Sequence, residues 1–260
     1  MRRAEARRRP MWRVARARLG TAVGCLLLAG GCARAAVDDV RSVAAQTSPV
    51  RTAEQDNVVR VVAVGNSITY GYGIENREKD SYPAQLQALL GPSYEVRNFG
   101  HSGTRVMRTS ARAYAGLPEY RAALAFEPQV VIIMPGVNNA TPADWVHKER
   151  FAADLKALIE SFRCARDGAP VQIWLGSIMP VSWHRTYEAI APNVAEVQRE
   201  VERVAAEEGV PLIDLYTPLV RESRYYPDSL HPTQEGAALF AETVYRALTG
   251  VDGKRRQGAR

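Results

Sequence analysis

The sequence predicts an α/β protein: a three-layer α/β/α sandwich built on a five-stranded parallel sheet. Five short runs rich in β-branched residues alternate with longer segments in which apolar residues recur at helical spacing. Such alternation is typical of parallel strands joined by crossover helices that cover both faces of the sheet. A chain of 260 residues that is 46% hydrophobic can bury one large core. We therefore expect a single domain over residues 58–249.

The apolar runs define the predicted strands, and side-chain periodicity defines the clearest helices. The strands are expected at 58–64, 94–99, 130–135, 171–176 and 211–216. The helix predicted within 147–163 has an apolar face made of Phe151, Leu155, Leu158, Ile159 and Phe162. The helix predicted within 232–250 has an apolar face made of Leu239, Phe240, Val244 and Leu248. We expect both faces to pack on the sheet.

Residues 1–35 have the composition of an export signal. An arginine-rich start precedes an apolar run at 19–31 and small residues at a plausible cleavage site. Cleavage before Cys32 would give a lipoprotein attached to the membrane through that cysteine, cleavage after Ala35 would release a soluble protein, and an uncut anchor is a third alternative. The location is then periplasmic, extracellular or membrane-anchored. Residues 36–57 are expected to be a linker, and 250–260 a basic flexible tail.

The net charge of +6 does not indicate nucleic-acid binding. Residues 1–35 hold nine arginines and one glutamate, a net charge of +8, so the rest of the chain carries −2. Cys164 is the one cysteine outside the leader, and no CxxC pattern or Cys/His cluster of zinc spacing occurs. We expect no disulfide within the domain, no metal and no nucleic-acid partner.

Polar residues follow several predicted strands at the edge where ligands bind in parallel sheets. Ser67 comes after the first strand and Gly65, near the expected start of a helix. Gly103 follows the second strand and Asn138 the third, and a backbone N–H or a carboxamide can stabilise an oxyanion. Before the last helix, a carboxylate and an imidazole lie three residues apart, at Asp228 and His231. This set offers a nucleophile, a base and an orienting acid.

Each of these signals is weak when taken alone. A serine after a strand is more often a cap or turn residue. Asp144 and His147 repeat the spacing of Asp228 and His231, although Asp144 can instead cap the helix that follows and leave His147 in its polar first turn. His101 and His184 have no acid at this spacing and are expected at the surface or beside substrate. The signal becomes specific when these residues are taken together, because they occur in order and each is expected at the same edge of the sheet.

Three tryptophans follow or lie within the third and fourth strands and are candidates for a sugar-binding platform: Trp145, Trp174 and Trp183. The alternative is ordinary core packing. That alternative is favoured for Trp174, which lies within an apolar run.

The ordered blocks "GNSITYG", "NFGHSG", "PGVNNA" and "DSLHP" resemble those of the SGNH, or GDSL-type, esterase and lipase superfamily. The resemblance covers about residues 58–249 and implies a flavodoxin-like fold. Within the family, "SYPAQLQALLG" and "LHPTQEGAALFAETV" look most like the bacterial branch of sialate O-acetylesterases and carbohydrate acetylesterases.

The resemblance implies Ser67 as nucleophile, His231 as general base and Asp228 as the acid that orients it. Gly103, Asn138 and the Ser67 N–H would form the oxyanion hole, and no cofactor or metal is needed. Two positions depart from the family pattern, because Asn66 and Asn139 stand where aspartate is usual. The second departure affects the contacts that would hold Asn138 in place.

The resemblance implies an exported serine esterase that acts on small-molecule or polysaccharide esters, with short O-acetyl groups on carbohydrate as the leading substrate. A lipase-like or lysophospholipase-like esterase and a cell-wall sugar O-acetyltransferase would use the same triad. A non-catalytic carbohydrate-binding domain is the alternative from another class. It leaves the joint presence of Ser67, Asp228 and His231 unexplained.

Overall fold

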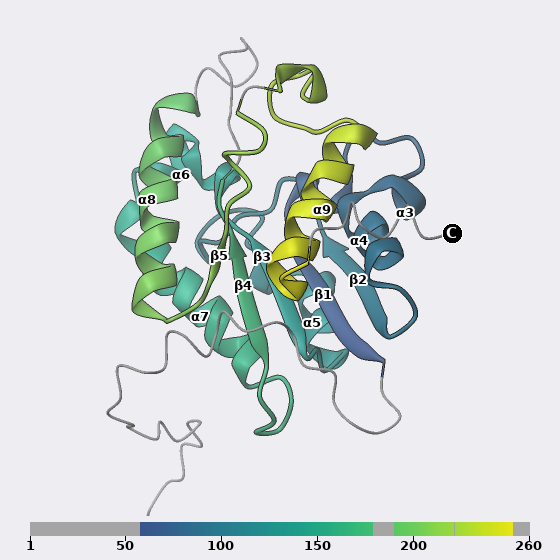
Figure 1. The fold of residues 1–260 in the computed structure, drawn as a ribbon. Helices are drawn as coiled ribbons and strands as arrows, with labels where there is room; N and C mark the ends of the chain where they lie inside the picture. The colour runs from purple at the N-terminus through teal and green to yellow at the C-terminus, as the bar shows by residue number, and fades with distance from the viewer. Residues whose placement is uncertain (1–57, 179–189, 221, 252–260) are drawn as a thin grey trace, which may run out of the picture. The chain divides into compact units, whose positions relative to one another are not determined.

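The computed structural model describes residues 58–178, 190–220 and 222–251, which form the predicted three-layer α/β/α sandwich (Figure 1). The leader and linker predicted over 1–57, and residues 252–260 of the predicted tail, lie outside the described residues. In chain order the elements are β1 (Val59–Gly65), α2 (Ser67–Tyr70), α3 (Arg77–Asp80), α4 (Tyr82–Leu90), β2 (Tyr94–Gly100), η1 (Tyr114–Gly116), α5 (Pro118–Ala125), β3 (Val130–Met134), η2 (Val137–Ala140), α6 (Pro142–Trp145), η3 (Lys148–Arg150), α7 (Phe151–Arg163), β4 (Gln172–Gly176), α8 (Ala191–Glu207), β5 (Leu212–Ile213), η4 (Ser223–Tyr225) and α9 (Gln234–Thr249).

As predicted, the five strands form one parallel sheet; their order in it is β2-β1-β3-β4-β5. β1 lies between β2 and β3, so the chain leaves β1 toward one edge and later returns to its other side. Because consecutive crossovers diverge there, a crevice is expected at the carboxyl ends of β1 and β3. The turns that carry Ser67 and Asn138 both leave the sheet at this point.

Helices cover both faces of the sheet. α9 packs against α4 on one face, and Figure 1 shows α9 in front of the sheet with α5 and α7 behind it. On the second face, the ring of Tyr120 in α5 meets the ring of Phe162 in α7 edge-on, with centroids 6.1 Å apart. The central strands are therefore enclosed: every residue of β3 is buried, as is all of β1 except Arg60.

The element ends differ slightly from the prediction. α7 begins at Phe151 instead of His147, because the chain from Lys148 to Arg150 forms a 3₁₀ turn. β5 is shorter than predicted, because the Asp214 carboxylate accepts the backbone N–H groups of Tyr216 and Thr217 and turns the chain out of the sheet. The predicted apolar face of α7 is fully buried, whereas on α9 Leu239 is only partly buried.

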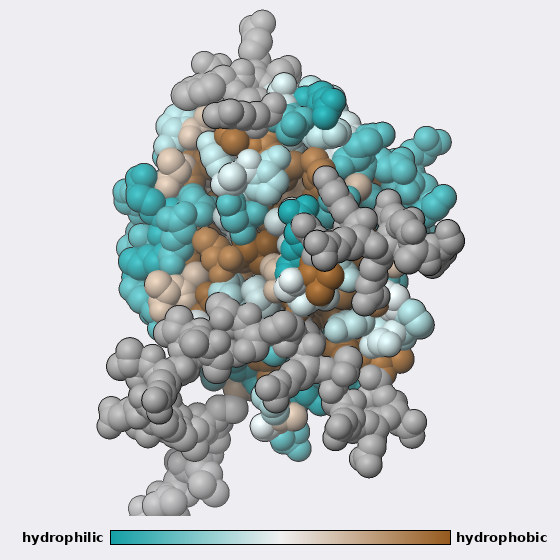
Figure 2. All heavy atoms as spheres, viewed as in Figure 1, coloured by the Kyte–Doolittle hydropathy of each residue, from teal (hydrophilic) through white to brown (hydrophobic). Residues whose placement is uncertain are grey.

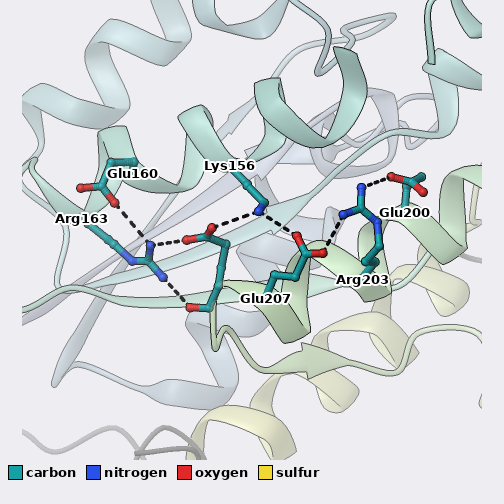
Figure 3. A network of polar contacts seen from close by, with 7 residues as sticks. Lys156, Glu160, Arg163, Glu200, Arg203 and Glu207 are labelled. Carbon is teal, nitrogen blue, oxygen red and sulfur yellow. Dashed lines mark hydrogen bonds and ion pairs between the residues drawn. The ribbon is translucent and has the colours of Figure 1, made fainter. Parts of the chain in front are cut away.

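Ion pairs connect α7 and α8 along their exposed sides (Figure 3). Lys156 lies 2.7 Å from Glu207, which also pairs with Arg203 at 2.6 Å on its own helix. Nearer the end of α7, Arg163 pairs with Glu208 at 2.7 Å. Pairs at the surface add little stability individually. We ascribe to this network the alignment of α8 along α7.

The outer side of β5 is apolar at the surface. Figure 2 shows apolar side chains between α8 and α9, where β5 lies in Figure 1. In this region Leu212 is 37% exposed and Tyr216 is 47% exposed. β5 is an edge strand that pairs with β4 alone within the described sheet. The described helices show no segment that is both long and apolar enough to cross a bilayer.

Candidate active site

Ser67 is the first residue of α2, directly after the turn that ends β1. The side-chain oxygen of Asn66 accepts the backbone N–H of Ile68 at 3.0 Å and caps this one-turn helix. A Cβ at Gly65 would clash with the Thr69 hydroxyl, so glycine is what lets α2 fold tightly over the strand end. Ser67 is thus both a turn residue and a side chain presented at the carboxyl edge of the sheet.

Three predicted residues form a continuous hydrogen-bonded relay. Ser67 Oγ lies 2.8 Å from His231 Nε2, and His231 Nδ1 lies 2.6 Å from Asp228 Oδ2. The other oxygen of Asp228 accepts the backbone N–H groups of Leu230 at 3.0 Å and of His231 at 2.7 Å. The turn therefore fixes the carboxylate, and the carboxylate fixes the imidazole.

The Asp228 carboxyl remains ionised at neutral pH. Partial burial by itself would raise its pKa, but hydrogen bonds from the His231 imidazole and from the two backbone N–H groups outweigh burial and hold the pKa below its usual range. An ionised Asp228 accepts a hydrogen bond from the Nδ1–H of His231, which leaves Nε2 as the acceptor for the Ser67 hydroxyl. This arrangement can deprotonate Ser67.

The two other predicted residues lie beside this relay. The carbonyl oxygen of Gly65 accepts the N–H of His101 at 3.0 Å and the hydroxyl of Thr104 at 3.3 Å, so the turn after β2 is held to the end of β1. Gly103 occupies that turn with a φ of 77°, a conformation that favours glycine. Asn138 donates one of its two side-chain amide hydrogens to Thr104 O at 2.9 Å. The second amide hydrogen of the same NH2 group is the one that could donate to an oxyanion.

The structure shows what the Asn139 side chain does at the position where aspartate is usual in the family. Asn139 is fully buried, and its side-chain oxygen accepts the N–H of Val106 at 2.8 Å. An amide oxygen serves this purpose as a carboxylate oxygen would, so the segment after Gly103 stays attached to the turn after β3. Within this segment, the Arg105 guanidinium donates a hydrogen bond to Gly103 O at 3.0 Å.

The second Asp-x-x-His pair is not a relay. Asp144 accepts hydrogen bonds from Arg105 Nε at 2.5 Å, from the Ser110 hydroxyl at 2.5 Å and from the Thr141 hydroxyl at 2.7 Å. Burial raises its pKa, but these three bonds together hold the pKa below its usual range. The expectation that Asp144 caps the following helix is wrong, because Thr141 caps α6 and Asp144 lies within it. His147 is exposed and precedes η3.

The other two histidines, His101 and His184, were expected at the surface or beside substrate, without an acid at the Asp-x-x-His spacing. His101 is partly exposed and has an acid partner in Glu119 on α5, whose Oε1 lies 2.9 Å from its Nδ1. That partner is 18 positions away in sequence, so local spacing could not reveal it. His184 lies outside the described residues.

The tryptophans do not form the predicted platform where they are described. Trp145 is 5% exposed, packs edge-on against Phe151 at 5.5 Å between ring centroids and donates its indole N–H to Glu196 at 2.7 Å. Trp174 is buried in the sheet, as its position in an apolar run favoured. Trp183 lies outside the described residues.

Sequence reasoning missed an aromatic residue at the site. The ring of Tyr72 is half exposed and lies 4.6 Å from the imidazole of His231 between centroids. Its signal was present in "GNSITYGYG", where a tyrosine stands between two glycines directly after α2. Among the described residues, no group of three or more His, Cys, Asp or Glu side chains is arranged to hold a metal ion.

Comparison with known proteins places this site in a family. The chain is 32% identical over 215 residues to an acetylxylan esterase from Xylanibacter ruminicola; the match covers 75% of this chain and 44% of that protein, so the chain spans less than half of its relative's length. The fold resembles a Mycobacterium smegmatis aryl esterase at a TM-score of 0.55 and 21% identity, over 74% of this chain and all of that one. It also resembles Est24, a carbohydrate acetylesterase from Sinorhizobium meliloti, at a TM-score of 0.57 and 17% identity, over 72% and 96% of the two chains.

A family model covers most of the described domain. The model of the GDSL-like lipase/acylhydrolase family matches residues 63–239, a range that begins within β1 and ends within α9. The match supports an ester hydrolase over a non-catalytic binding domain. It confirms the predicted superfamily, and the five-stranded parallel sheet with helices on both faces confirms the fold that this resemblance implied. The chain belongs to the GDSL-like lipase/acylhydrolase family.

Proposed function

We propose that this protein is a serine esterase that removes short acyl groups, above all acetyl groups, from carbohydrate. The observation that carries the proposal is the relay from Ser67 Oγ through the His231 imidazole to the Asp228 carboxylate, at 2.8 and 2.6 Å. The relative described as an acetylxylan esterase supports acetylated carbohydrate as the substrate class.

The reaction follows from the positions of these groups. His231 Nε2 takes the proton of Ser67 as Oγ attacks the acyl carbon, and the carbonyl oxygen becomes an oxyanion. The N–H groups of Ser67 and Gly103 and the carboxamide of Asn138 would stabilise that charge. The C–O bond to the alcohol then breaks as His231 returns the proton to the leaving oxygen. Water, activated by the same imidazole, releases the acid and restores Ser67.

A small hollow at the turn that carries Ser67 supports a short acyl group. Its volume is about 20 Å³, and its lining includes both chain neighbours of Ser67, Asn66 and Ile68, although not Ser67 itself. A space of this size holds roughly one water-sized group. The methyl group of an acetyl ester meets that limit, whereas a long acyl chain would have to extend elsewhere.

Hydrolysis of p-nitrophenyl esters from acetate to palmitate tests the function and the acyl length together. We expect the rate to be greatest for acetate and to fall with chain length. The Ser67→Ala variant should lose ~10⁵ to 10⁶ in turnover, the scale known for nucleophilic serines. Ser161→Ala, which removes a hydroxyl from α7 that donates to Leu158 O, is the matched control.

Two outcomes would contradict the proposal. Turnover of p-nitrophenyl acetate by Ser67→Ala at the wild-type rate would exclude Ser67 as the nucleophile. A rate that grows from acetate to palmitate would instead favour a lipase-like esterase. A fluorophosphonate probe, which labels activated serines, should modify the wild type and the Ser161→Ala variant but not Ser67→Ala.

We also propose that the chain is exported, on the composition of residues 1–35. Mass spectrometry of the protein from its native host tests both cleavage routes, because a chain beginning at lipidated Cys32 differs in mass from one beginning after Ala35. Substituting Cys32 by Ala should release the protein from the membrane only if the first route is used. Recovery of the uncleaved chain in the cytosol would refute export.

A further inference from the structure

The wall of the active site formed by His231 opens into a pocket that the mechanism leaves without a ligand. The pocket has a volume of about 300 Å³. It is lined by Tyr72, Gly73, Ile74, Glu75, Asn76, Asp80, Pro227, Asp228, His231, Pro232, Thr233 and Gln234. These residues come from the segment after α2, from α3 and from the turn that leads into α9. The volume lies at the lower end of the ~300 to 1,000 Å³ typical of small-molecule sites.

We propose that this pocket binds the alcohol half of the ester and that it accepts an uncharged sugar in preference to an acidic one. The inference rests on the proposed esterase function and adds the substrate class to it. The position of the pocket beside His231 supports this assignment. His231 must return its proton to the leaving oxygen, so that oxygen lies within hydrogen-bond reach of Nε2. The alcohol that carries it then extends to the imidazole side of the site, where the pocket opens.

Tyr72 gives the pocket a surface suited to a sugar ring. Its side chain is 54% exposed, and its ring meets the imidazole of His231 at an angle of 47° with centroids 4.6 Å apart. Its backbone N–H donates to the carbonyl oxygen of Ser67 at 2.9 Å, which fixes the residue relative to the nucleophile. An exposed ring held in this way presents an apolar face to the C–H groups of a sugar at little entropic cost.

The remaining polar side chains of the pocket suit hydroxyl groups. Asp80 accepts a hydrogen bond from the side-chain amide of Gln234 at 3.1 Å, and this pair joins α3 to the start of α9 across the pocket. Asn76 and Glu75 are exposed at its rim. Carboxamides and carboxylates together offer donors and acceptors to neighbouring hydroxyl groups.

The charge of the lining argues against an acidic sugar. Glu75, Asp80 and Asp228 contribute three carboxylates, and the residues described as lining the pocket include no lysine or arginine. Two cations adjoin lining residues in sequence: Arg77, whose guanidinium lies over the ring of Tyr70 at 4.1 Å, and Lys79, which is not among the lining residues. A carboxylate on the substrate would face like charges without a partner, which disfavours binding. The pocket thus separates acetylated neutral sugars, such as those of xylan, from acetylated sialic acid.

Acetate release from three esters tests this inference on the full-length protein. The esters are acetylated methyl xyloside, 9-O-acetyl sialic acid and 2,2,2-trifluoroethyl acetate, whose alcohol has no sugar ring to pack on Tyr72. We expect kcat/KM for the xyloside to exceed that for the sialic acid at least ~10-fold. In Tyr72→Ala, the ratio of kcat/KM for the xyloside to that for trifluoroethyl acetate should fall up to ~10-fold, mainly through KM.

Control variants separate the contribution of the Tyr72 ring from that of its hydroxyl and from the loss of an exposed tyrosine elsewhere. Tyr72→Phe retains the ring and should keep the wild-type ratio, as should Tyr216→Ala, which removes an exposed tyrosine that does not line the pocket. Glu75→Gln should narrow the preference for the xyloside over the sialic acid. If Tyr72→Ala lowers kcat/KM for all three esters equally, or if the wild type prefers the sialic acid, the inference is wrong. Failure of the wild type to cleave even trifluoroethyl acetate would instead reject the esterase function.

Discussion

Replacing Asp228 by asparagine tests whether the carboxylate sets the proton position on His231. In the structure, Oδ1 accepts two backbone N–H groups and Oδ2 accepts the Nδ1 proton. An asparagine can place its oxygen in only one of these positions. If the oxygen replaces Oδ1, both backbone bonds survive and the amide NH2 points at Nδ1. If it replaces Oδ2, the NH2 faces two N–H donors.

The magnitude of the effect follows from that choice. The second orientation loses two hydrogen bonds of ~0.5 to 1.5 kcal/mol each, so it is disfavoured by about 1 to 3 kcal/mol. The NH2 therefore donates to Nδ1 in most molecules, and the imidazole proton moves to Nε2. There it faces Ser67 Oγ as a donor and cannot act as a base. Serine proteases with the equivalent change lose ~10⁴ in kcat, about 5.4 kcal/mol of barrier, and we expect a similar loss here.

The assay is the turnover of p-nitrophenyl acetate, together with ¹⁵N NMR of the imidazole to locate its proton. Asp214→Asn is the matched control, because Asp214 Oδ1 also accepts hydrogen bonds from two backbone N–H groups, those of Tyr216 and Thr217, and none of the described hydrogen bonds joins it to an imidazole. We expect that control to retain wild-type turnover. A loss of less than tenfold in Asp228→Asn, with the imidazole proton still on Nδ1, would refute the reasoning.

Three other predictions concern the surroundings of the relay. Asn138→Ala removes the carboxamide held by Thr104 O and should lower kcat ~10²- to 10³-fold with little change in folding, as measured by steady-state kinetics and thermal unfolding. Asp144→Asn should lower the free energy of unfolding in urea by about 1.5 to 3 kcal/mol at pH 7. Because the folded-state pKa of Asp144 is lowered, its contribution is present above the unfolded pKa of ~3.9 and is lost as pH falls through the folded value, so the difference from the wild type should shrink toward pH 3. His147→Ala should leave turnover unchanged, whereas His231→Ala should abolish it. The reverse result would show that Asp144 and His147, and not Asp228 and His231, form the catalytic pair.

The strands of the sheet were well predicted from the sequence because a strand buried on both faces is a nearly continuous run of apolar residues. β1 and β3 are almost wholly apolar, and each is followed by a glycine-containing turn, so their ends and the residues just beyond them could be located. Parallel pairing then placed Ser67 and Asn138 at one edge without knowledge of any contact. Strand order was not predicted, since local periodicity does not encode which strands pair.

Contacts between distant side chains were not predictable in the same way. His101 and Glu119 meet because α5 packs behind β2, and Trp145 is buried because α8 presents Glu196 to its indole N–H. Each contact depends on how a helix is placed on the sheet. Trp145 and Trp174 are buried and do not form the candidate platform for this reason. Exposure is a property of the packed structure, and the sequence around an aromatic residue near a strand end does not separate a core residue from a surface one.

The two Asp-x-x-His pairs show where spacing stops being informative. Asp144 lies within α6, and the chain continues in a near-helical path, so the N–H of His147 donates to the backbone oxygen of Asp144 and not to its carboxylate. Between Asp228 and His231 the chain passes through Ser229 at a φ of 71°, which interrupts any helical path. That turn directs two backbone N–H groups at the Asp228 carboxylate and brings the imidazole to its other oxygen. In this chain the same spacing gives a relay at the pair with a left-handed residue between its members, and nothing in the sequence indicated that Ser229 would adopt that conformation.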